Sequence, residues 1–199
     1  MKKVVCVLGS PRTSGNSESI ARKFCDITES LGAETEVFNL NNLTYKGCQA
    51  CMACKSGHEE CVVTDGLTNV LKAIREADIL LMASPIYFGQ ISGQVKCLID
   101  RMYSFLKPTY MVNNDRSRLD VGKKAILIAT QGNPSPDKFD AFATYTEFFG
   151  PEWFGFEVHV IRGLGLIQKT DAAEQDDLLK RVEETAQYVL VDTAPKGCG

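Results

Sequence analysis

The stretch from Val4 to Ser17, VVCVLGSPRTSGNS, decides the fold predicted for this chain. It opens with a short continuous apolar run, 4–8, which is typical of a strand buried on both faces. The run stops at Gly9, and helix-like sequence then extends from Ser17 to Ser30. A strand, a loop of small residues and a helix, in this order, indicate an α/β unit built on a parallel sheet.

Later segments continue the alternation of strands and helices. The expected strands are 4–8, 34–40, 79–83, 125–130 and 156–161. The expected helices are 17–30, 67–77, 93–106, 138–149 and 172–191, and the polar segment 107–121 is expected to be a surface loop. The pattern predicts one doubly wound α/β domain over residues 1–193, with a five-stranded parallel sheet, a cysteine-rich loop at 46–63 after the second strand, and a flexible tail at 194–199.

Composition narrows the classes of function. The chain has 199 residues and a formal net charge of -3, with Lys and Arg scattered along it, which argues against a nucleic-acid partner. No apolar stretch is long enough to span a bilayer, so no membrane association is expected. The amino-terminal apolar run reaches Gly9 too soon for a signal peptide, and the expected location is the cytoplasm. There the eight cysteines are expected to be thiols or metal ligands rather than disulfides.

The loop at 9–17 is a candidate phosphate site. Parallel sheets bind ligands beyond the carboxyl ends of their strands, and this loop combines small residues, several hydroxyl groups and an arginine with the start of a helix. It has neither the dinucleotide fingerprint nor the lysine of a nucleotide phosphate loop, so a monophosphate fits best. The alternative is a turn that only caps the helix. The candidate residues in this loop are Ser10, Arg12, Ser14, Gly15, Asn16 and Ser17.

Two further loops are expected at the same edge of the sheet. The segment SPIYFG at 84–89 follows the third strand and carries two adjacent aromatic residues, and Gln131 and Gly132 follow the fourth strand. Aromatic and apolar walls with backbone donors suit a planar ring, although Tyr87 and Phe88 are alternatively explained as a cover for the core. The three loops together predict a site for a ligand with one phosphate and one flat ring.

A phosphatase is a rival interpretation, because Cys6 and Arg12 have the spacing of the phosphate loop of cysteine-dependent phosphatases and Thr13 follows. That chemistry needs a thiolate at the bottom of the loop. Here the apolar strand continues beyond Cys6, which is therefore expected to be a buried packing residue, like Cys25 and Cys97 in helices.

Four cysteines, Cys48, Cys51, Cys54 and Cys61, form a C-x2-C-x2-C-x6-C pattern in a segment bounded by Gly47 and Gly57. Four closely spaced thiolates are enough to ligate one iron-sulfur cubane. Zinc is the main competitor, although zinc sites usually pair two C-x2-C units across a longer insert, and free thiols are the third possibility. Cys198, in the tail, is a candidate reactive thiol.

These motifs resemble the flavodoxin-like NADPH-dependent FMN reductases, and among them the iron-sulfur flavoproteins. The resemblance rests on GSPR at 9–12, GNS at 15–17, SPIYFG at 84–89, and Ser92-Gly93 followed by Lys96 and Asp100-Arg101. It implies FMN as cofactor, the strand order 2-1-3-4-5, and a homodimer or homotetramer that completes the flavin sites. It assigns the phosphate to Ser10, Arg12, Ser14, Asn16 and Ser17, and the isoalloxazine to Pro85, Ile86, Tyr87, Phe88 and Gly89.

For the cysteine motif, the resemblance implies a 4Fe-4S cluster near the flavin, ligated by all four residues. Where relatives often have two aspartates after the motif, this chain has Asp65-Gly66. The function expected is therefore an FMN-dependent oxidoreductase that passes electrons between FMN and the cluster, with no side chain acting as a nucleophile. The electron donor is reduced ferredoxin or NAD(P)H, and the acceptor is a quinone, dioxygen or another redox protein. The alternatives are a cluster-free NAD(P)H-dependent FMN or quinone reductase and a zinc-stapled binding module without redox chemistry.

Overall fold

A computed structural model of the chain describes residues 1–140 and 142–191. The predicted tail at 194–199, with Cys198, lies outside the described residues. Among the helices that the structure describes, none is long and apolar enough to cross a membrane.

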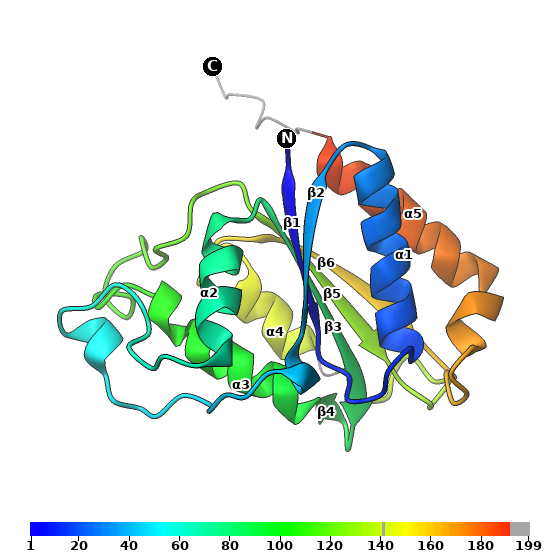
Figure 1. The fold of residues 1–199 in the computed structure, drawn as a ribbon, viewed down its shortest axis with the longest axis horizontal. Coiled ribbons are helices and arrows are strands. Elements are labelled where there is room, and N and C mark those ends of the chain that lie inside the picture. Colours follow the sequence, from blue (N-terminus) through cyan, green and yellow to red (C-terminus); the bar gives the residue numbers. More distant parts are fainter. Residues whose placement is uncertain (141, 192–199) are drawn as a thin grey trace.

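The sheet has the predicted topology. Five parallel strands, β1 (Lys3–Leu8), β2 (Glu34–Asn39), β3 (Ile79–Tyr87), β5 (Lys124–Thr130) and β6 (Glu157–Gly163), lie in the order β2-β1-β3-β5-β6 (Figure 1). This is the order 2-1-3-4-5 of the predicted flavodoxin-like fold once the parallel strands are counted alone. A short strand that was not predicted, β4 (Gln90–Ile91), pairs antiparallel with the end of β3. β3 therefore continues through Tyr87, into the segment predicted to be a loop.

In the part of the chain that the structure describes, five α-helices cover the sheet, and shorter 3-10 helices adjoin them. The α-helices are α1 (Asn16–Ser30), α2 (Gly66–Glu76), α3 (Gly93–Arg101), α4 (Phe142–Phe149) and α5 (Asp176–Leu190). The 3-10 helices are Leu40–Asn42, Ala53–Lys55, Met102–Phe105 and Asp171–Glu174. The helix predicted at 93–106 is thus an α-helix that continues as a tighter 3-10 turn.

Two helix starts come later than predicted, because side chains hold the preceding backbone in other conformations. The carbonyl of Lys138 accepts hydrogen bonds from Gln131 and Arg162, so the helix predicted from 138 begins at Phe142. The carboxylate of Asp171 accepts the N–H groups of Ile167 and Gln168, and the helix predicted from 172 begins at Asp176.

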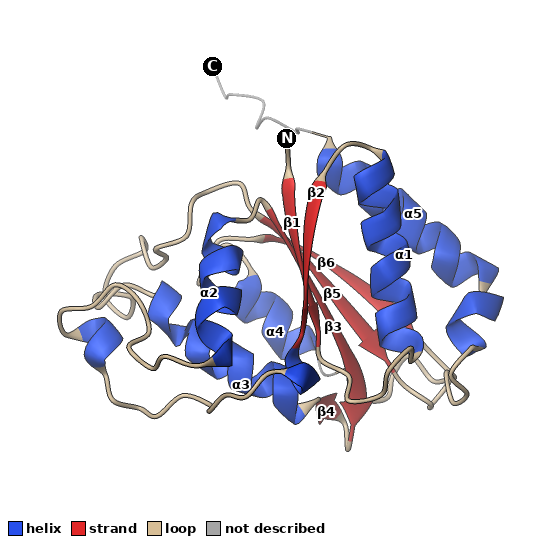
Figure 2. Cartoon of the chain, viewed as in Figure 1, coloured by secondary structure: helices blue, strands red, loops and turns tan. Residues whose placement is uncertain are grey.

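The hydrophobic core has two layers. Figure 2 shows α1 and α5 on one side of the sheet and α2, α3 and α4 on the other. Alternate residues of β1 face the two layers: Val4, Cys6 and Leu8 pack with α1 and α5, whereas Val5 and Val7 pack on the opposite side. Strands buried on both faces explain the continuous apolar runs in the sequence.

Cys6 lies in this core with no exposed surface, as expected. A hydrogen bond with Cys25 and burial raise the pKa of the Cys6 thiol well above its usual value. A protonated thiol away from solvent cannot attack a phosphate ester, so the phosphatase interpretation is wrong.

Candidate functional site

The three predicted loops meet at one cavity at the carboxyl ends of β1, β3 and β5, which we call the rim cavity. Its volume is about 130 Å³. It is lined by Ser10, Arg12, Gly15, Asn16, Ser17, Pro85, Ile86, Tyr87, Thr130, Gln131, Gly132, Leu166 and Ile167. Ten of the thirteen residues predicted to bind the cofactor are in this set, and Ser14, Phe88 and Gly89 are not. No sequence pattern pointed to Leu166 and Ile167, which follow β6.

The first loop folds tightly over the start of α1. The hydroxyl of Ser10 accepts the N–H of Arg12 at 3.1 Å, and α1 begins at Asn16 with Gly15 as its N-cap. Ser14 has a positive φ of 54°, and its N–H donates to the Glu18 carboxylate at 2.8 Å. The amide of Ser14 is therefore engaged within the protein, whereas the start of α1 presents the positive end of a helix to the rim cavity.

Asn16 and Gln131 line the rim cavity, yet their side chains hold neighbouring loops. The amide of Asn16 donates to the Gln168 carbonyl at 2.7 Å and accepts the N–H of Ala172 at 3.0 Å. The amide nitrogen of Gln131 donates to the carbonyls of Asn133, Ser135 and Lys138. Both residues shape the cavity through these loops.

The aromatic pair Tyr87 and Phe88, at the end of β3 and in the turn that follows, does not cover the core. Tyr87 is 45% exposed, and Phe88 is fully exposed at the tip of the β3–β4 hairpin. Phe88 and Gly89 both have positive φ, 49° and 77°, as a two-residue turn of type I′ requires. The alternative explanation of Tyr87 and Phe88 as core residues is therefore wrong.

Close packing fixes the position of the first loop against α3. A Cβ atom on Gly9 would lie 2.0 Å from Cγ2 of Val95, so no larger residue fits. Ser92, the N-cap of α3, donates its hydroxyl to the Gly9 carbonyl at 2.7 Å. Its N–H donates to the hydroxyl of Ser84 at 2.9 Å, which joins this loop to the end of β3.

The four cysteines of the cysteine loop (residues 46–63) border one small hollow beside α3. Ala50 and Met52, which alternate with the cysteines, have positive φ values of 50° and 58°. Non-glycine residues in this conformation cost about 1–2 kcal/mol each, and such strain clusters at ligand sites. The predicted ligands therefore converge, and the loop around them is strained.

Zinc and iron-sulfur clusters place different demands on their cysteine ligands. A zinc ion requires four ligands at about 2.0–2.3 Å from one point. Among the described residues, no three His, Cys, Asp or Glu side chains are gathered closely enough to hold a metal ion. A cluster of several irons takes its thiolates at separate corners, so its ligands need not meet at one point. Four thiols around one hollow are a donor set that suits an iron-sulfur cluster.

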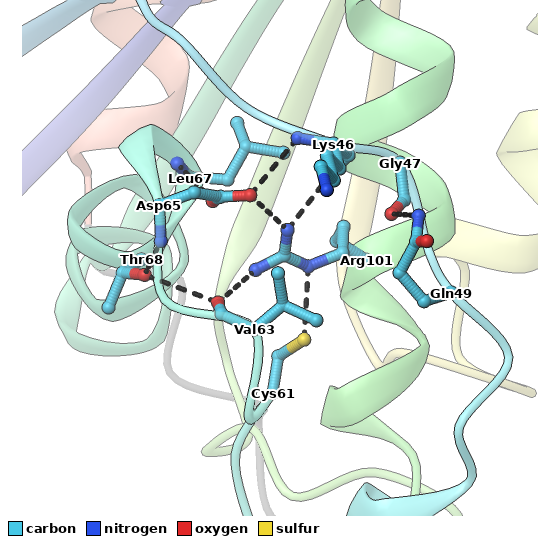
Figure 3. A network of polar contacts seen from close by, with 9 residues as sticks. All are labelled: Lys46, Gly47, Gln49, Cys61, Val63, Asp65, Leu67, Thr68 and Arg101. Carbon is cyan, nitrogen blue, oxygen red and sulfur yellow. Dashed lines mark hydrogen bonds and ion pairs between the residues drawn. The ribbon is translucent and has the colours of Figure 1, made fainter.

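Two cationic groups contact the sulfur atoms. Nε of Arg101 donates to Sγ of Cys61 at 3.0 Å, and Nζ of Lys55 lies 3.6 Å from Sγ of Cys54. Figure 3 shows the contacts of Arg101, which also forms an ion pair with Asp65 at 2.9 Å. Sequence reasoning assigned neither Arg101 nor Asp65 to this site, although Arg101 belonged to a quoted motif and Asp65 follows the cysteines.

A larger cavity, of about 740 Å³, lies between α3 and α4, and we call it the aromatic cavity. Cys48 and Gln90 both line it, so it extends from the cysteine loop to the β3–β4 hairpin. Burial and a hydrogen bond with Tyr110 raise the pKa of Tyr103 to about 12, so this phenol stays protonated at neutral pH. The aromatic residues that line this cavity are Tyr103, Tyr110, Tyr145, Phe148, Trp153 and Phe154.

Similar proteins were found by sequence and by structure. An iron-sulfur flavoprotein of Methanocaldococcus jannaschii is 36% identical over 99 residues, which is 50% of this chain and 51% of that protein. The chain spans about half the length of the curated relatives it matches.

Among solved structures, an FMN-dependent NADH-azoreductase of Bacillus anthracis in complex with FMN aligns with a TM-score of 0.71 at 16% identity, covering 95% of this chain and 99% of that one. An NAD(P)H:quinone oxidoreductase of Methanothermobacter marburgensis aligns with a TM-score of 0.70 at 14% identity, covering 96% and 98%. At these identities the likeness shows a shared fold.

The sequence profile of one family covers most of the structure described above. Residues 2–136 match the NADPH-dependent FMN reductase family. This segment includes two of the three loops of the rim cavity in full, the start of the third, and the whole cysteine loop. Because the match covers more than half of the chain, this chain belongs to the NADPH-dependent FMN reductase family.

Proposed function

We propose that this protein is an FMN-dependent oxidoreductase that passes electrons between FMN and a 4Fe-4S cluster ligated by Cys48, Cys51, Cys54 and Cys61. The observation that carries the proposal is that these four cysteines border one hollow beside α3, in a fold whose sheet edge holds the rim cavity. Membership of the FMN reductase family supports the flavin, and the names of the curated relatives support the cluster.

The rim cavity supplies the groups that an FMN phosphate needs. We expect the hydroxyl groups of Ser10 and Ser17, the guanidinium of Arg12 and the N–H groups at the start of α1 to bind its oxygens. Pro85, Ile86 and Tyr87 would border the ring system, with Phe88 and Gly89 next to it on the hairpin. Gly15, Gln131 and Gly132 keep backbone close to the cavity. Ser14 acts through the shape of the first loop, because its N–H donates to Glu18 and it does not line the cavity. Asn16 acts in the same way, because its side-chain amide holds Gln168 and Ala172.

When both are bound, the flavin exchanges electrons with donors as pairs and the cluster exchanges them singly. The chain itself holds and orients the two centres. Arg101 and Lys55 donate to cysteine sulfurs, which offsets part of the negative charge that four thiolates bring together. The aromatic cavity extends from the cysteine loop to the hairpin. The redox partner of the protein is proposed to be NAD(P)H, ferredoxin, a quinone or dioxygen.

We also propose that the protein works as a homodimer or homotetramer. Phe88 is fully exposed on the hairpin beside the rim cavity, and Tyr87 is partly exposed. Large aromatic side chains in such positions are typical of surfaces covered by a partner.

A cluster-free NAD(P)H-dependent FMN or quinone reductase is the second candidate. It is favoured by the fold shared with a solved NAD(P)H:quinone oxidoreductase and by the absence, among the described side chains, of a preassembled metal-ion site. The two candidates differ in whether the cysteine loop carries iron.

Iron and acid-labile sulfide, measured on protein purified without air, distinguish these candidates. The proposal predicts about four irons and four sulfides per chain, with loss of most of both in Cys54→Ser. Cys97→Ser is the matched control, since Cys97 lies on α3 outside the motif and does not border the hollow. Iron retained equally in both variants would contradict ligation by Cys54, and wild-type protein with flavin and no iron would support the cluster-free reductase instead.

A further inference from the structure

Arg101 is the largest fully buried side chain of the described residues, with 1% of its surface exposed. It is the last residue of α3, and its guanidinium points at the cysteine loop (Figure 3). Moving a charged group out of water costs several kcal/mol unless partners compensate. The partners of the buried guanidinium therefore indicate what Arg101 does in the fold.

The partners of Arg101 are the two ends of the cysteine loop. One terminal nitrogen donates to the carbonyl of Lys46 at 3.0 Å, and the other donates to the carbonyl of Val63 at 2.6 Å. Nε donates to Sγ of Cys61 at 3.0 Å. Residues 46 and 63 are the first and last residues of the loop, so one planar fork from a helix fixes both of its ends and one of its sulfurs.

Asp65 supplies the negative charge that offsets the buried charge of Arg101. Its carboxylate pairs with Arg101 at 2.9 Å, accepts the N–H of Lys46 at 3.0 Å, and caps α2 by accepting the N–H of Leu67 at 2.9 Å. Through this carboxylate the loop ends, α2 and α3 form one rigid unit. The guanidinium of an arginine stays charged in proteins, so the Asp65 carboxylate supplies its countercharge inside the fold.

We propose that Arg101 is a positioning residue for the cluster: it holds the cysteine loop in place before iron is bound, and its bond to Cys61 raises the reduction potential of the bound cluster. This inference rests on the proposed function. A cationic N–H donor on a ligand sulfur stabilises the more negative, reduced state, so its removal lowers the potential.

Lys55 does not have this role, although it lies near Cys54. It belongs to the middle of the cysteine loop and donates from there to the carbonyls of Tyr103 and Leu106, at 2.6 and 2.8 Å, so it contacts neither end of the loop. Arg101 reaches both ends of the loop and the Cys61 sulfur from a helix that packs on the sheet, and groups on such rigid elements hold a site most precisely.

Arg101→Lys is the decisive variant, because it keeps a positive charge beside Asp65 and removes the fork that reaches Lys46, Val63 and Cys61. Arg75→Lys is the matched control. Arg75 also donates to a carbonyl of the cysteine loop, that of Glu59 at 2.8 Å, but no sulfur is among its partners.

The first measurement is hydrogen exchange of amides 46–65 in metal-free protein. Exchange is expected to be at least about tenfold faster in Arg101→Lys than in wild type and in Arg75→Lys. The second is a redox titration of the reconstituted protein. The cluster potential is expected to fall by about 59 mV, a tenfold change in a one-electron equilibrium, while the flavin potential stays as in wild type.

Unchanged exchange together with an unchanged cluster potential in Arg101→Lys would overturn the inference while leaving the proposed function intact. Wild-type protein that takes up no iron would overturn the proposed function and the claim about potential, and the exchange experiment would still decide whether Arg101 holds the loop. If Arg101→Lys does not fold, the double variant Arg101→Gln with Asp65→Asn removes both buried charges together, and the same two shifts are expected of it.

Discussion

Gly9 shows most directly how a single residue sets the geometry of the rim cavity. A Cβ atom at this position would lie 2.0 Å from Cγ2 of Val95 and 3.1 Å from the Ala83 carbonyl oxygen. Gly9→Ala is expected to lower the free energy of unfolding by about 1–3 kcal/mol, the usual cost of overpacking a dense core. It is also expected to weaken FMN binding, since the first loop must move.

Urea denaturation and quenching of FMN fluorescence measure these two effects. Gly93→Ala is the matched control, because a Cβ atom at Gly93 has no other atom within 4 Å. If both alanine variants behave like wild type, the close contact between β1 and α3 does not constrain the loop.

Asp65 gives a prediction about pH. Burial alone would raise the pKa of its carboxyl, but hydrogen bonds from the N–H of Lys46 and from Arg101 lower it below its usual value. A carboxyl whose pKa is lower in the folded state contributes stability above its unfolded pKa of about 3.9 and loses it as pH falls through the folded value. Asp65→Asn retains the cap of α2 and removes the ion pair.

The difference in unfolding free energy between wild type and Asp65→Asn is therefore expected to be about 3 kcal/mol near pH 7 and to shrink below about pH 4. Urea denaturation between these pH values measures it. A difference that is constant across the range would mean that the charge of Asp65 does not stabilise the fold.

At the scale of elements, the β3–β4 hairpin shows a conflict between conformation and sequence. Phe88 has φ of 49° and a fully exposed ring, whereas glycine or asparagine would adopt this turn without strain. Phe88→Asn is expected to raise Tm by about 2–4 °C because the left-handed backbone then costs less. The same variant is expected to bind FMN more weakly or to assemble less well, since the aromatic surface is lost.

Calorimetry and analytical ultracentrifugation with and without FMN test both parts. Phe88→Tyr retains the ring and the strain and is the control. A variant Phe88→Asn that is more stable and unchanged in flavin binding and assembly would leave the exposed ring without the proposed role.

Lys123 is a buried residue whose side chain caps the carboxyl end of α2. Its Nζ donates to the carbonyls of Arg75 at 2.9 Å and Ala77 at 2.5 Å, at the end of α2. Lys123→Met fills the same space but leaves both carbonyls unpaired, and it is expected to lower the free energy of unfolding by about 2 kcal/mol. Lys72→Met, on the exposed face of α2, is the control for urea denaturation. Equal stability of the two variants would contradict this account.

Local sequence patterns predicted the strands well where every residue of the apolar run is buried. The apolar runs of β1 and β5 are buried on both faces, and their sequences show it. Local sequence patterns did not predict the backbone correctly where contacts with residues far along the chain determine its conformation. The start of α4 depends on Gln131 and Arg162, and the short strand β4 depends on pairing with the end of β3.

At the scale of the whole molecule, the topology brought the predicted loops together. The order of strands was enough to place the loops after β1, β3 and β5 at one edge, and ten predicted residues line the rim cavity there. The roles of Asn16 and Arg101 were beyond sequence reasoning, because their partners are far along the chain: Ala172 for Asn16, and Cys61 and Asp65 for Arg101.

The proposed chemistry requires that the chain holds FMN at the rim cavity and an iron-sulfur cluster in the cysteine loop. The visible absorption spectrum of protein purified without air, recorded before and after dithionite, tests both cofactors at once. We expect flavin bands on a broad cluster absorption, both bleached by the reductant, with about one FMN and one cluster per chain. A flavin spectrum without the broad absorption would contradict the cluster, and a colourless protein that takes up no added FMN would contradict both cofactors.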